Sequence, residues 1–152
     1  MAGQRMAVFF DIGDTLASPV VTAGRLTGLD VYPLVPEVLD RLAAHGDRVA
    51  LGLVSNTGTE TASSMRQLLG DAGLLDHFDD DLCLFSSVEG LDKSDPAFFT
   101  LAGERAGLPP ARCLYVGESE AERAVAAAAH LAVSPHPLHA LHTVDTELHP
   151  PG

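Results

Sequence analysis

A carboxylate follows directly on an apolar run near the amino terminus. The run covers residues 7–10 (Ala-Val-Phe-Phe), and Asp11 ends it, before a turn that contains Gly13, Asp14 and Thr15. This pattern predicts a buried parallel strand that presents Asp11 at its carboxyl end. In open α/β sheets that edge is where ligands bind. A carboxylate placed there can serve as a nucleophile and so split one difficult step into two easier ones.

Two further segments carry groups that suit a phosphoryl group. Ser55 and Asn56 follow a second apolar run, 49–54, and precede a predicted helix. Hydroxyl and N–H donors at a helix start favour an anion, although a simple N-cap is the alternative role for Ser55. Lys93 lies in a polar loop, in a chain with only nine lysines and arginines. Its ammonium could offset the charge of a carboxylate beside a phosphoryl group.

Two glutamates follow the apolar run 113–116. Glu118 and Glu122 are four residues apart, so they would face the same side of a helix start. Carboxylate oxygens are ligands that Mg²⁺ accepts. The alternative is an acidic helix start that the helix dipole favours.

Together these segments resemble the four motifs of the haloacid dehalogenase (HAD) superfamily, over roughly residues 6–134. Motif I, four hydrophobic residues followed by Asp-x-Asp-x-Thr, is matched at Asp11 and Thr15. The resemblance implies a Mg²⁺-dependent enzyme that forms an aspartyl-phosphate on Asp11. We accordingly expect catalytic roles for Asp11, Lys93 and Ser55, substrate contacts from Thr15, Asn56 and Asp14, and Mg²⁺ ligation by Asp11, the Gly13 carbonyl, Glu118 and Glu122.

The sequence departs from the family pattern at two places. Gly13 replaces the second Asp of motif I, which in the family protonates the leaving group and then activates water. Loss of such a group typically costs about 10²–10⁴-fold in rate, so alkyl phosphates should react slowly. In motif IV, Glu118 replaces an Asp, and Arg123 stands where the alternative second acid would be.

The order of the expected elements predicts an α/β fold. Apolar strands at 6–12, 49–54, 82–86, 113–116 and 131–134 alternate with helices at 36–45, 59–72, from Pro96, and at 117–129. This alternation calls for a parallel sheet covered on both faces. The resemblance implies a Rossmann-like three-layer sandwich with strand order 5-4-1-2-3. We expect one domain over 1–152 without a separate cap, a flap-like insertion at 17–35 and a surface tail at 135–152.

The composition of the chain limits which classes of binding partner we expect. The chain has 152 residues and a net charge of −12, which disfavours nucleic acid and anionic lipid. We expect a cytoplasmic protein, because no signal peptide or bilayer-spanning stretch is visible. Cys83 and Cys113 fall in predicted strands and are expected to be packed thiols.

Two classes of function remain open. The first is an atypical phosphatase or phosphoryl-transfer enzyme that acts on a phosphorylated small molecule, a carrier-bound intermediate or a protein. In the absence of a cap, a second copy or a partner subunit could act as the lid. The alternative is a catalytically degenerate HAD domain that serves as a binding or regulatory module. Mg²⁺ between Asp11 and Glu118 would favour the enzyme, and a salt bridge from Lys93 or Arg123 in that space would favour the module.

Overall fold

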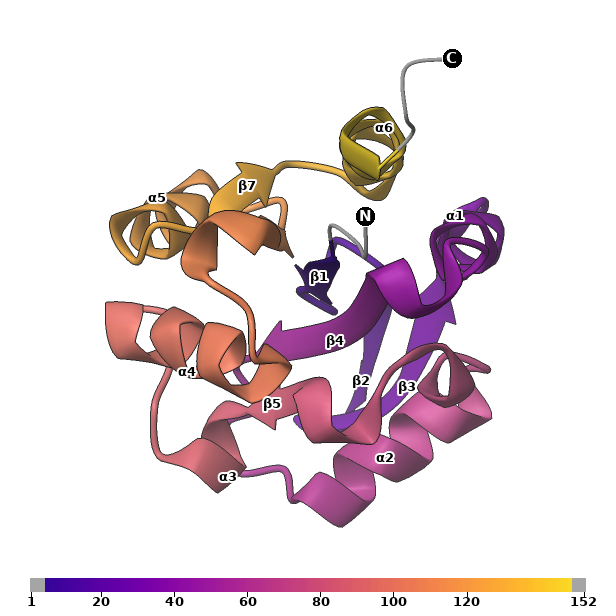
Figure 1. Ribbon diagram of the computed structural model, residues 1–152. Coiled ribbons are helices and arrows are strands. Elements are labelled where there is room, and N and C mark those ends of the chain that lie inside the picture. The colour runs from indigo at the N-terminus through magenta and orange to yellow at the C-terminus, as the bar shows by residue number, and fades with distance from the viewer. Residues whose placement is uncertain (1–4, 149–152) are drawn as a thin grey trace.

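Five parallel strands form the central sheet, and helices lie on both of its faces (Figure 1). The computed structural model describes residues 5–148. The sheet strands are β1 (Met6–Phe10), β4 (Val49–Ser55), β5 (Cys83–Phe85), β6 (Cys113–Val116) and β7 (Ala132–Ser134). Their order is β5-β4-β1-β6-β7. These labels differ from the expected 5-4-1-2-3 because two hairpin strands are numbered between β1 and β4; the α/β class is as predicted.

The side chains of β1 alternate between two apolar layers, as the pleat of a strand requires. Val8 and Phe10 pack in one layer, and Ala7 and Phe9 pack in the other. The first layer includes residues of α1 (Val35–Ala43), α2 (Ala62–Asp71) and α6 (Pro137–Leu148). The second includes residues of α4 (Pro96–Ala106) and α5 (Glu120–Ala128). A further single turn of helix, α3 (Ser86–Glu89), connects β5 to the loop that carries Lys93.

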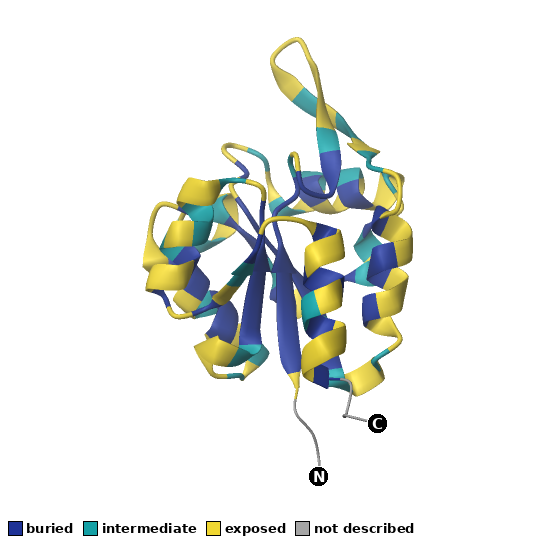
Figure 2. Ribbon diagram, turned by 90° about the horizontal axis from the view of Figure 1, so that it is seen from above, coloured by how far each residue is buried: buried dark blue, intermediate teal, exposed yellow. Residues whose placement is uncertain are grey.

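The two strands outside the central sheet form a hairpin within the segment 17–35, where we expected a flap-like insertion. β2 (Ala17–Thr22) pairs antiparallel with β3 (Arg25–Val31). Ala23 and Gly24 connect them, both with positive φ (52° and 79°), which suits a tight two-residue hairpin turn. The hairpin projects from the body of the domain, and most of β2 is exposed (Figure 2). We call this hairpin the flap.

The carboxyl-terminal segment differs from the surface tail that we expected. Residues 137–148 form the helix α6, and Ala140, Val144 and Leu148 are buried in the core. Pro137 does not interrupt this helix because it occupies the first position, where no helical N–H bond is lost. Residues 149–152 of the expected tail lie outside the described residues.

Within residues 5–148, none of the helices combines the length and the apolar character that crossing a membrane would demand.

Candidate functional site

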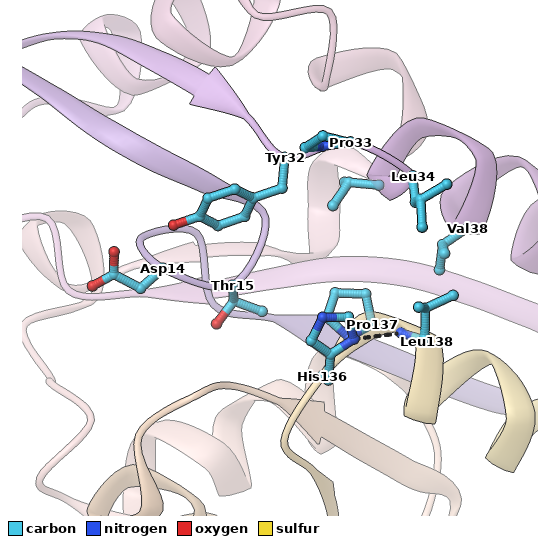
Figure 3. Close-up of a pocket in the computed structure, with 10 residues that line it drawn as sticks. Asp14, Thr15, Tyr32, Pro33, Leu34, Val38, His136, Pro137 and Leu138 are labelled. Carbon is cyan, nitrogen blue, oxygen red and sulfur yellow. Dashed lines mark hydrogen bonds between the residues drawn. The ribbon is translucent and has the colours of Figure 1, made fainter.

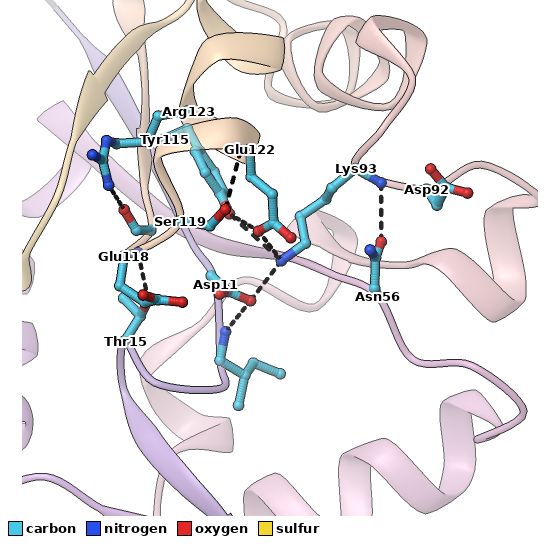
Figure 4. Close-up of polar contacts among 12 residues, drawn as sticks. Asp11, Thr15, Asn56, Asp92, Lys93, Tyr115, Glu118, Ser119, Glu122 and Arg123 are labelled. Atoms are coloured by element: carbon cyan, nitrogen blue, oxygen red, sulfur yellow. Dashed lines mark hydrogen bonds and ion pairs between the residues drawn. The ribbon is translucent and has the colours of Figure 1, made fainter.

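Asp11 lies at the carboxyl end of β1, buried to 8% exposure. Its Oδ1 accepts hydrogen bonds from the Ile12 backbone N–H (2.8 Å) and from Lys93 Nζ (2.6 Å) (Figure 4). Within residues 5–148, no hydrogen bond reaches the other carboxylate oxygen, Oδ2. Oδ1 is therefore the anchored atom of this carboxylate.

Lys93 is also buried, at 3% exposure, and connects three elements of the site. Besides Asp11, its Nζ contacts Glu122 Oε1 at 2.9 Å and the Tyr115 hydroxyl at 3.5 Å. Its backbone N–H donates to Asn56 Oδ1 at 3.0 Å. Both ends of the residue are thus held, so the ammonium has a fixed position beside the candidate nucleophile.

The site carries more negative than positive charge. Asp11 and Glu122 share the single ammonium of Lys93. Burial raises the pKa of Asp11, and the charge of Lys93 only partly opposes this. Burial, together with Asp11 and Glu122, also raises the pKa of Tyr115. Tyr115 therefore keeps its proton, which it donates to Glu122 Oε1 at 3.2 Å.

The loop after β6 is tied to the Asp11 loop. The Glu118 N–H donates to Thr15 Oγ1 at 3.1 Å, and Arg123 donates to the Gly117 carbonyl at 2.8 Å. Ser119 accepts from the Glu122 N–H at 3.3 Å and so caps α5. These contacts place Glu118 beside the Asp11 loop, although its side chain is exposed.

The three residues that we expected to contact the substrate, Thr15, Asn56 and Asp14, differ in their surroundings. Thr15 and Asn56 each make a contact within the protein, to Glu118 and Lys93 respectively, so their oxygens position the site. Asp14 is exposed, with a positive φ of 62°. It lines a hollow of about 360 Å³ together with Tyr32 and His136 (Figure 3). Ser55 and Asn56 do not line this hollow, so the substrate contact expected of Asp14 stays a prediction.

Ser55 and Asn56 line a different hollow, which lies between the flap and the loop after β4. It has a volume of about 400 Å³ and extends from Gly13 to the start of α2. Ser55 is buried to 6% exposure. Ile12 and Gly13, the two residues that follow Asp11, line this hollow, and we call it the flap groove.

Of the four oxygen ligands that we expected for Mg²⁺, only some are available in the structure. Glu122 Oε1 contacts Lys93 and Tyr115, so this oxygen of the expected metal ligand is engaged within the protein. No cluster of three or more His, Cys, Asp or Glu side chains suited to a metal occurs within residues 5–148. The free Asp11 oxygen, the Gly13 carbonyl and Glu118 remain as hard oxygen donors. Mg²⁺ commonly keeps several waters and uses one or two carboxylates, so this smaller set fits it.

Two residues of the site were not expected from the sequence. Tyr115 looked like an ordinary strand residue, and only its position one residue before the end of β6 could have indicated that its hydroxyl reaches the sheet edge. Thr57 accepts from the Ser87 N–H and donates to Ser87 Oγ, which joins the loop after β4 to α3. No pattern in the sequence predicted that pairing, because the partners are 30 residues apart.

The model of one protein family matches residues 22–130, and its description is haloacid dehalogenase-like hydrolase. The chain belongs to this family. The match includes Ser55, Lys93 and Glu118 but begins after Asp11, so the place of Asp11 in the site depends on the structure. No curated protein matches the chain.

Solved structures of HAD proteins share the fold. A HAD-superfamily hydrolase of subfamily IA from Geobacter sulfurreducens is 18% identical, with a TM-score of 0.70 over 94% of this chain and 100% of that chain. An L-2-haloacid dehalogenase is 21% identical, with a TM-score of 0.65 over 78% and 58%. A predicted phosphoglycolate phosphatase from Haemophilus somnus is 28% identical, with a TM-score of 0.59 over 69% and 44%. The neighbours of this HAD domain thus include a phosphatase and a dehalogenase.

Proposed function

We propose that this HAD-family chain is a phosphohydrolase or phosphoryl-transfer enzyme in which Asp11 is the nucleophile. The observation that carries the proposal is the asymmetry of the Asp11 carboxylate. One oxygen is held by Lys93 Nζ and the Ile12 N–H, while the other makes no hydrogen bond within residues 5–148. A nucleophile with one anchored and one free oxygen is oriented for attack before the substrate arrives.

The other residues of the site would bind and orient the phosphoryl group. Lys93 offsets the charge that develops as Asp11 attacks, and Ser55 offers a hydroxyl at the edge of the groove. Asn56 and Glu122 hold Lys93, and Thr15 holds the Glu118 loop. Asp11, the Gly13 carbonyl and Glu118 would hold Mg²⁺, which when bound neutralises charge on the phosphoryl oxygens. The excess of carboxylates over ammonium groups supports a need for such a cation.

A second candidate is a HAD domain that binds a partner without turnover. The salt bridges of Lys93 to Asp11 and Glu122 favour it, since a lysine bridge was the feature expected of a binding module. Neither Lys93 nor Arg123 pairs with Glu118 in the described part of the chain, however, and Arg123 is directed to the Gly117 carbonyl. Because the space between Asp11 and Glu118 is not bridged by either cation, we favour the enzyme.

Hydrolysis of para-nitrophenyl phosphate, with and without Mg²⁺, tests the proposal. This leaving group needs little protonation, so the missing acid at position 13 should matter least. We expect metal-dependent turnover in the wild type and a loss of at least about 10³-fold in Asp11→Asn, in line with removal of a catalytic group. Asp71→Asn, an exposed change in α2, is the matched control and should retain activity.

Mass spectrometry of the quenched reaction provides the second measurement. We expect one added phosphoryl group on wild-type protein and none on Asp11→Asn. Equal turnover in wild type and Asp11→Asn would exclude Asp11 as the nucleophile. Absence of turnover and of covalent labelling in the wild type would leave the binding module as the better account.

A further inference from the structure

The flap groove begins at Gly13, one of the two places where the sequence departs from its family pattern. A Cβ built on Gly13 would have Pro19 Cγ, at 3.8 Å, as its nearest neighbour, which is an ordinary van der Waals distance. The φ of Gly13 lies outside the left-handed region, so other residues could adopt this backbone. The missing side chain is therefore not excluded by crowding. The space that a side chain at position 13 would occupy is open and forms part of the flap groove.

The walls of the groove are apolar on one side and hydroxylic on the other. The flap contributes Pro19, Val21, Leu26 and Leu29, and the opposite side is lined by Ser55, Thr57 and Thr59. The volume of about 400 Å³ falls within the range of roughly 300–1,000 Å³ that is typical of small-molecule sites. The groove can thus hold a flat apolar group with a polar edge.

The charge of the groove disfavours esters whose leaving group already carries a negative charge. No Lys, Arg or His is among the described residues that line it, and Glu60 is its one charged lining residue. Glu60 accepts from Ser64 Oγ at 3.0 Å and lies 3.8 Å from the exposed Arg25. A leaving group that is already charged in the bound ester would meet this carboxylate without a cation in the lining to offset it, whereas a neutral aryl group would not, and the phenolate that forms would be repelled towards solvent.

We propose that the flap groove binds the aromatic leaving group of an aryl phosphate monoester, which departs as a phenolate without a proton from the protein. This inference rests on the proposed function and names its substrate class. Two independent features carry it: no acid stands at position 13, and a side chain there would face Pro19 on the apolar flap side of the groove. A phenolate tolerates this absence because its charge is delocalised.

The reaction balances with the phosphate ester and water as its only reactants. Asp11 Oδ2 attacks phosphorus, the bond from phosphorus to the aryl oxygen breaks, and that oxygen leaves with the bonding electrons. Water then attacks the phosphorus of the aspartyl-phosphate, the bond to Asp11 breaks, and the carboxylate is restored. The proton of the water passes to solvent, and the products are phenolate and inorganic phosphate.

A series of leaving groups tests the chemistry. Phenyl phosphates with increasingly basic phenols, and one alkyl phosphate, are compared in wild type and Gly13→Asp. We expect kcat/KM of the wild type to fall steeply along the series and to be smallest for the alkyl phosphate. Gly13→Asp should raise kcat/KM for the alkyl phosphate by about 10²–10⁴-fold, the usual contribution of general acid–base catalysis.

Two neighbouring flap residues test the location. Val21 lines the groove and is 61% exposed, whereas Val20 is 44% exposed and does not line it. A carboxylate at position 21 would oppose an apolar ligand and the anion that leaves. We therefore expect Val21→Glu to raise KM for phenyl phosphates by about three- to tenfold, and Val20→Glu to leave it unchanged. Circular dichroism of both variants verifies that the fold is retained.

The outcomes separate the inference from the proposed function. Turnover that requires Asp11 but shows no dependence on the basicity of the leaving group would overturn the inference alone. Equal KM values in Val20→Glu and Val21→Glu would also overturn it. If no phosphate ester is turned over and no phosphoryl group is found on Asp11, the proposed function fails and takes the inference with it.

Discussion

At the scale of single residues, Asp11 combines burial with incomplete compensation of its charge. The Lys93 ammonium pairs with the Asp11 carboxylate, but it also pairs with Glu122, so one positive charge is shared by two negative ones. The raised pKa of Asp11 follows from its removal from water. Functional sites commonly accept such a loss of stability because the chemistry requires the group.

The pH dependence of stability should expose this cost. Because the folded-state pKa of Asp11 is raised, its contribution to stability is fully present below the unfolded-state pKa and is lost as pH rises through the folded-state value. Asp11→Asn removes the charge, so we expect this variant to be more stable than the wild type at pH 7 by about 0.5–2 kcal/mol. The difference should shrink towards pH 4. Urea unfolding of metal-free protein across this pH range measures it.

A variant that is inactive yet more stable would show that loss of activity does not come from unfolding. The opposite result, a less stable Asp11→Asn at neutral pH, would mean that the salt bridge to Lys93 outweighs the burial of the carboxylate. In that case the charge balance that we describe for the site would be wrong.

At the scale of elements, the close approach of β4 to its neighbours depends on a glycine. A Cβ on Gly52 would lie 2.5 Å from the Leu82 carbonyl oxygen and 2.9 Å from Phe9 Cε1. Since these atoms belong to the backbone and to a fully buried ring, they have little freedom to move. The packing of β4 therefore requires the absence of a side chain at this position.

Gly52→Ala should destabilise the protein by about 1–3 kcal/mol, the usual cost of overpacking a core. Gly70→Ala in α2 is the matched control, because its Cβ would meet only Leu75 Cδ2, at 3.8 Å. We expect this control to be neutral or to stabilise by up to about 1 kcal/mol, since alanine favours a helix. Thermal unfolding of both variants checks the difference. Equal effects would contradict the crowding at position 52.

The elements also show what could be predicted from the sequence. The apolar runs that become β1, β4 and β6 predicted the sheet and the residues at its edge, because buried parallel strands leave a strong local pattern. The helix α6 was not predicted, because a proline disfavours a helix interior, although Pro137 is compatible with the first turn that it occupies. The engagement of Glu122 by Lys93 and Tyr115 could not be predicted either, since it depends on contacts between distant segments.

At the scale of the whole molecule, acidic residues outnumber basic ones, 21 to 9, which gives a net charge of −12. Repulsion among these charges opposes the compact state, and salt screens charges that are exposed and well separated. Most of the salt bridges involve at least one exposed partner, so they offset this repulsion only weakly.

We therefore expect the melting temperature to rise with ionic strength. Between 20 and 500 mM KCl, screening worth about 1 kcal/mol would raise it by about 2–4 °C for a chain of this size. Tetramethylammonium chloride should act similarly, because screening does not depend on a specific cation. A melting temperature that falls with added salt would show that attractive pairs, and not net repulsion, dominate.

The positions of the chain ends have a practical consequence. Asp11 follows the carboxyl end of β1, whereas Arg5 precedes its start, and Arg48 donates to the Leu148 carbonyl near that same start. Both ends of the described chain therefore lie at the edge of the sheet opposite the site, away from the projecting flap (Figure 2). A protein immobilised through either end would present Asp11 and the flap groove to the solution, which makes surface-based binding assays with aryl phosphates straightforward to orient.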